Sequence, residues 1–122
     1  MGFLNKLLGM KDIDVSGNLQ VGTFQKRFKE AFGTEIKVYN AKSDGTLNTG
    51  QGAKSAPSKS TMANICAKGQ KVQDITIKKS KSVGEIEKDF ADKMGIGIQI
   101  MLPDGSGFAD NSMRLKDVSK QT

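Results

Sequence analysis

The stretch VGTFQKRFKEAFGTEIKV at residues 21–38 returns in altered form as VGEIEKDFADKMGIGIQI at residues 83–100. The two copies align without a gap at an offset of 62 residues, and the alignment extends back to residues 12 and 74. Internal self-similarity is interpreted before any local pattern because it constrains the whole fold. Two copies are too few for a solenoid, so the sequence indicates one internally duplicated domain.

Each copy carries the same order of local patterns. In the first copy, alternating apolar residues at 13–15 predict a strand, and apolar residues three and four positions apart predict an amphipathic helix over residues 21–32. Gly33 stands where a left-handed residue would end that helix. A second strand follows at residues 36–38, and an Asp-Gly turn comes next. The second copy repeats this plan 62 positions later, with Ser82 and Glu85 forming a capping box at its helix start.

Two tandem βαβ units predict an α+β fold. The expected arrangement is a two-layer sandwich of the ferredoxin-like βαββαβ type, with two helices covering one face of a four-stranded sheet. Neither copy could bury its apolar helix face alone, so the two copies complete one core. The other face of the sheet would stay open and would carry Lys37, Tyr39 and Met101.

The rest of the chain divides into a helix, a connector and the repeats. Residues 1–11 read as an N-terminal amphipathic helix, and residues 12–122 as a single domain. Within it, repeat one spans 12–48, a mobile basic connector rich in Gly, Ser, Thr and Lys spans 49–71, and repeat two spans 72–118.

Composition narrows the class of protein. The 122 residues suit one domain. The sequence contains no run of eighteen apolar residues, so it predicts no membrane span. One cysteine allows no internal disulfide and suits a cytoplasmic location. The net charge of the chain is +6. Residues 41–81 hold eight lysines and two aspartates, which equals that whole excess, so the positive charge is concentrated around the connector.

The second copy also resembles a known family. Residues 75–118 are similar to a ubiquitin-like β-grasp unit from its second strand to its last loop. SVGEIEKDFADKMGI corresponds to the helix, and IQIMLPDGSGFADNSMRLKDV to the hairpin and the following loop, with Asp110, Leu115 and Asp117 matching. The resemblance implies a β-grasp as the alternative fold. The duplicated pattern is also similar to small bacterial tandem-repeat proteins of unassigned function, and neither resemblance carries over a functional site.

Residues for catalysis are few. The chain has no histidine, the commonest general base and metal ligand, and Cys66 has no obvious activating base. Turn and capping roles explain Asp104, Asp110 and Asp117 better than a cation site of oxygen ligands does. The sequence therefore predicts a non-enzymatic protein that uses no cofactor and no metal.

Two binding functions follow from these patterns. The first is a small protein-interaction or self-assembly module that binds another protein or itself. Its candidate residues lie on the open sheet face and the N-terminal helix: Phe3, Leu4, Leu7, Leu8, Lys37, Tyr39 and Met101. The alternative is nonspecific nucleic-acid binding, because clustered lysines neutralise phosphates. Its candidate residues are Lys54, Lys59, Lys68, Lys71, Lys78, Lys79 and Lys81.

Overall fold

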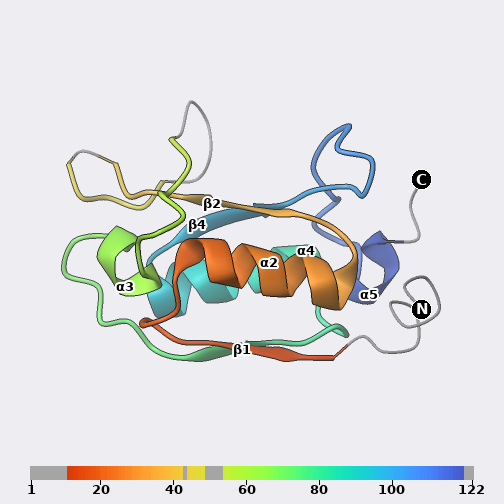
Figure 1. The fold of residues 1–122 in the computed structure, drawn as a ribbon, viewed down its shortest axis with the longest axis horizontal. Helices are drawn as coiled ribbons and strands as arrows, with labels where there is room; N and C mark the ends of the chain where they lie inside the picture. The colour runs from red at the N-terminus through yellow and green to blue at the C-terminus, as the bar shows by residue number, and fades with distance from the viewer. Residues whose placement is uncertain (1–10, 43, 49–53, 120–122) are drawn as a thin grey trace.

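The structure is a computed structural model that describes residues 11–42, 44–48 and 54–119. Helices and strands alternate along this part of the chain, which confirms the α+β class (Figure 1). The elements are β1 (Ile13–Val15), α2 (Val21–Phe32), β2 (Ile36–Tyr39), α3 (Met62–Ile65), β3 (Ile75–Ile77), α4 (Val83–Asp89), the π-helix η1 (Phe90–Met94), β4 (Gly97–Ile100) and α5 (Leu115–Val118). No helix in the described ranges is long and apolar enough to cross a membrane.

The strands pair across the two repeats. β1 runs antiparallel to β3, with Asp14 opposite Thr76, and β2 runs antiparallel to β4, with Lys37 opposite Gln99. Each strand thus pairs with its own equivalent in the other copy. The two repeats are therefore related by a pseudo-twofold axis that passes through both strand pairs.

The sequence predicts one four-stranded sheet, and this prediction is corrected. The described strands form two separate two-stranded sheets, which lie on opposite sides of the helices (Figure 1). Four phenylalanines, Phe24, Phe28, Phe32 and Phe90, are fully buried between them. Alternation along a strand decides which side chains face inward, but it does not decide which strand is the partner. Two separate sheets can therefore bury the same strand residues that alternation predicts to face inward, and they enclose the aromatic core from two sides.

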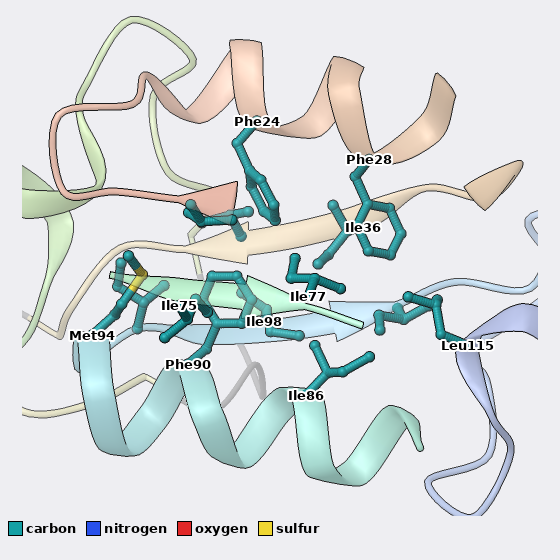
Figure 2. Packing of buried hydrophobic residues seen from close by; sticks show 14 of the residues in the cluster. Phe24, Phe28, Ile36, Ile75, Ile77, Ile86, Phe90, Met94, Ile98 and Leu115 are labelled. Atoms are coloured by element: carbon teal, nitrogen blue, oxygen red, sulfur yellow. The ribbon is translucent and has the colours of Figure 1, made fainter. Parts of the chain in front are cut away.

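Helix α2 forms as its apolar spacing predicts. Val21, Phe24, Phe28 and Phe32 are all 0% exposed, and the rings of Phe24 and Phe90 approach to 5.5 Å between centroids across the two repeats. Figure 2 shows the side chains of α2 and of α4 with η1 pointing toward each other from opposite sides of the strands. Burying each phenylalanine contributes roughly 1.5–3 kcal/mol, so the shared core holds the copies together.

The second helix begins and ends with the predicted residues. Ser82 Oγ accepts a hydrogen bond from the Glu85 backbone N–H at 3.2 Å, and Glu85 Oε1 accepts one from the Ser82 N–H at 3.0 Å. This confirms the capping box. Gly95 ends η1 with φ of 66°, and Gly33 ends α2 with φ of 74°, so both glycines are left-handed as predicted.

The described part of the connector folds against the rest of the domain. Residues 54–71 include α3, whose Met62 and Ile65 are buried in the core. The Val21 backbone N–H at the start of α2 donates to the Ser60 carbonyl at 2.8 Å. This segment satisfies helix-end donors that would otherwise lack partners, which is why it folds onto the domain. Residues 49–53 lie outside the described residues.

Helix α5 plays the same part in repeat two. Leu115 and Val118 are buried, and the Val83 N–H donates to the Met113 carbonyl at 2.8 Å. A β-grasp would place a hairpin before its helix, but within the described residues a single strand precedes α2 and another precedes α4. Each copy therefore obtains its strand partner from the other copy.

Candidate interaction surface

Four side chains define a surface that we call the β2–β4 outer face: Lys37, Gln99, Met101 and Phe108. Lys37 pairs with Gln99, and Met101 pairs with Phe108 in an isolated bridge. Directly opposed residues share one face of a sheet, and so do residues two apart on a strand. The buried alternate residues Ile98 and Ile100 face the core, so these four side chains face away from it.

Phe108 is the distinctive residue of this face. It is 49% exposed and is the one large hydrophobic side chain that is exposed among the described residues. The Lys37 Nζ atom lies 5.7 Å from the centroid of its ring, within the range of a cation–π contact. The face therefore presents an aromatic ring with a cation beside it.

The backbone beneath Phe108 is held on both sides of its hairpin. The Leu102 N–H donates to the Gly107 carbonyl at 2.9 Å, and the Ala109 N–H donates to the Ile100 carbonyl at 2.8 Å. At the turn, hydrogen bonds from Ser106 hold the pKa of Asp104 below its usual value. The ring is thus presented by a hydrogen-bonded hairpin.

Met101 lies where the sequence predicts, on the outer face beside Phe108. It is half-buried, and its backbone N–H donates to the Glu35 carbonyl at 2.9 Å. The Thr34 hydroxyl donates to the Met101 carbonyl. These bonds tie β4 to the start of β2 and fix the position of the Met101 side chain.

Tyr39 is placed differently from the prediction. It was expected to lie exposed on an open face, but it is only 5% exposed. The segment around Ser55 pairs with it in an isolated bridge, and the Ala56 N–H donates to the Val38 carbonyl at 2.9 Å. The Tyr39 hydroxyl donates to Gln99 Oε1 at 2.5 Å, and burial raises the pKa of Tyr39. The Tyr39 side chain therefore holds Gln99 by a hydrogen bond and is too buried to contact a partner.

Sequence reasoning missed Phe108 as a site residue. Register supplies the missing signal, because Phe108 follows the turn that pairs it with Met101, and Met101 was predicted to face outward. The other four candidates of the interaction set, Phe3, Leu4, Leu7 and Leu8, lie outside the described residues.

Six of the seven candidate nucleic-acid lysines are exposed. Lys54, Lys59, Lys68, Lys71, Lys78 and Lys79 are exposed, whereas Lys81 is half-buried and forms an ion pair with Asp89 at 2.6 Å. The Lys54 carbonyl accepts from the Asn40 N–H beside β2, while the Lys79 N–H donates to Asp12 Oδ1 at the end of β3. Lys54 and Lys79 therefore adjoin different sheets.

The described part of the chain offers little catalytic chemistry. No group of three or more cysteine, aspartate or glutamate side chains there could hold a metal ion. The Cys66 thiol donates to the Ala63 carbonyl at 3.1 Å. Asp110 accepts hydrogen bonds from Ser112, which hold the pKa of that carboxyl below its usual value. These carboxylates stabilise turns.

Comparison of the chain with protein-family models, curated proteins and solved structures gave no match. The candidate function therefore rests on the geometry of the chain itself.

Proposed function

We propose that this protein is a small, non-enzymatic interaction module that binds another protein, or a second copy of itself, through the β2–β4 outer face. The observation that carries the proposal is Phe108, which is 49% exposed on a hydrogen-bonded hairpin with Lys37 beside its ring. Phenylalanine and methionine are among the residue types enriched at protein interfaces, and a few central side chains there carry most of the binding energy.

A site-specific photo-crosslinker tests this proposal. The crosslinking amino acid replaces Phe108 in one variant and exposed Lys116 of α5 in a control variant, and both are irradiated in cells. We expect a discrete covalent adduct, with a second copy or with another protein, only from position 108. Adducts at both positions, or at neither, would count against the β2–β4 outer face.

Replacement of Phe108 by serine is the companion test, because Ser55 of the connector pairs with Tyr39, the equivalent of Met101. Phe108→Ser should weaken the interaction found by crosslinking at least about tenfold, since truncation of a central aromatic commonly costs that much or more. The interaction should persist at high salt, because an apolar contact depends little on ionic screening.

Nonspecific nucleic-acid binding is the second proposal. It is supported by the exposure of six of the seven candidate lysines, all except Lys81. Binding of a short mixed DNA should fall steeply between low and high salt if phosphates are neutralised. A charge-reversal pair, Lys78→Glu with Lys79→Glu, should then weaken it more than Phe108→Ser does.

The remaining assignments are proposals of the same kind. A cytoplasmic location is supported by the single cysteine, and a sandwich built around one core is supported by the buried cluster that both copies share.

A further inference from the structure

A pocket of about 310 Å³ is lined by residues of β1, α2 and β3 and their neighbours. The β1–β3 sheet lies on the side of the helices away from the β2–β4 sheet (Figure 1). Its charged lining residues are Asp14 on β1, Arg27 on α2 and Asp74 just before β3. All three are exposed, and within the described residues Arg27 forms no ion pair with either carboxylate. The pocket therefore brings together charged groups of both signs that do not form ion pairs with each other.

Repeat two provides an internal comparison for this pocket. The equivalents of Leu19 and Arg27, 62 positions later, are Lys81 and Asp89. Lys81 Nζ lies 2.6 Å from Asp89 Oδ2, so repeat two fills the equivalent place with its own ion pair. Repeat one has a shorter, uncharged side chain at Leu19 and a cation at Arg27. The two equivalent positions in repeat one therefore form no ion pair with each other.

The lining groups specify the chemistry of a ligand. The guanidinium of Arg27 has the planar fork that binds a carboxylate through two hydrogen bonds. Ionised Asp14 and Asp74 only accept hydrogen bonds, so they suit an ammonium group. Asp14 Oδ1 already accepts from Thr76 Oγ1 at 2.7 Å, which orients that carboxylate and leaves Oδ2 for a ligand. Two carboxylates against one guanidinium disfavour a phosphate or another polyanion.

We propose that this pocket binds a small free zwitterion, and that a basic amino acid fits it best. The ligand carboxylate pairs with Arg27, and its ammonium groups pair with Asp14 and Asp74. The half-buried Leu19, which also lines the pocket, offers apolar surface to the methylene chain. A volume of about 310 Å³ is at the small end of ligand pockets and suits a molecule of amino-acid size. This inference is independent of the interaction proposed for the β2–β4 outer face.

Amide chemical-shift titration of the ¹⁵N-labelled full chain tests the ligand class. The probes are L-lysine, L-lysinamide (which lacks the carboxylate) and L-glutamate (which has one ammonium and two carboxylates). We expect saturable shifts with L-lysine at residues 14–19 and 74–76. L-lysinamide should bind at least about tenfold more weakly, because it loses a charge-assisted hydrogen-bond pair. No saturable shift with L-lysine, or equal affinity for L-lysinamide, overturns the proposal.

Three variants locate the site. Arg27→Ala should weaken L-lysine binding at least about tenfold, whereas Lys26→Ala, a neighbouring exposed cation outside the pocket lining, should change it less than twofold. The double variant Leu19→Lys with Arg27→Asp imports the ion pair of repeat two and should abolish binding. Its well-dispersed spectrum would show that it remains folded. Equal losses in Arg27→Ala and Lys26→Ala, or binding retained by a folded double variant, overturn the site.

Discussion

The two repeats share one backbone plan but differ in what they present at their surfaces. Phe28 and Phe90 occupy equivalent positions, and both are 0% exposed. By contrast, Tyr39 of repeat one forms a bridge with Ser55 of the connector, whereas its equivalent Met101 forms one with Phe108. Only the second bridge leaves an aromatic ring exposed. Both copies fill one core, so inward positions tolerate little change. Surface positions have no such constraint, so the functional candidates are found where the copies differ.

The largest expected effect tests the shared core. Phe28→Ala and Phe90→Ala should each lower the free energy of unfolding by about 3–5 kcal/mol, because each leaves a cavity among fully buried rings. Urea denaturation followed by circular dichroism measures both. Phe108→Ala is the control and should stay within about 0.5 kcal/mol of the wild type. A cost for one phenylalanine less than half that for the other would show that the copies do not contribute equally to the core.

A smaller effect separates the two helix starts. Ser82 caps α4 with its side chain, whereas Gln20 makes no side-chain cap bond at the start of α2. Ser82→Ala should therefore lower the free energy of unfolding by about 1 kcal/mol, and Gln20→Ala should leave it nearly unchanged. Thermal unfolding of the two single variants measures this difference. Equal losses would show that the capping box does not distinguish the repeats.

The smallest effect concerns Gln25 and its equivalent, Glu87. Gln25 Nε2 donates to the Ile36 carbonyl at 3.0 Å, a bond that an ionised carboxylate cannot make. Burial raises the pKa of Glu87. Because the folded state then holds this proton more tightly than the unfolded state, the contribution of Glu87 to stability rises as pH falls through its folded pKa. That contribution is fully present below the usual glutamate value of about 4.3.

Glu87→Gln should consequently stabilise the protein at pH 7 by roughly 0.5–1 kcal/mol, the usual net value of one hydrogen bond. The gain should shrink as pH falls toward 4. The reciprocal change, Gln25→Glu, should destabilise at pH 7 and recover at low pH. Urea denaturation at several pH values compares the two variants, and a pH-independent effect of Glu87→Gln would refute the assigned cause.

Local features of the fold could be predicted from the sequence with good accuracy. The helix that begins at Val21, the left-handed ends at Gly33 and Gly95, and the Ser82 cap all depend on residues within a few positions of one another. Met62 and Ile65 of α3 have the same spacing as Leu115 and Val118 of α5. No sequence pattern of this kind predicts the π-helix η1.

The candidate site was predictable only in part. Lys37 and Met101 were placed correctly on an outward face, because strand alternation determines their side. Tyr39 was misplaced, because alternation cannot show that the segment around Ser55 would pair with β2 and cover the ring. Phe108 was missed for the converse reason, since its exposure depends on how its hairpin folds back on β4.

The sequence by itself determined the duplication and the two long helices with their ends and apolar faces, because periodicity and glycine positions act within single elements. Only the tertiary structure decided that β1 pairs with β3 and β2 with β4. It also decided that Phe108 stays exposed and that repeat one keeps a pocket where repeat two has the ion pair of Lys81 with Asp89. These outcomes depend on contacts between residues far apart in the chain, and a strand's alternation is satisfied equally well by more than one partner.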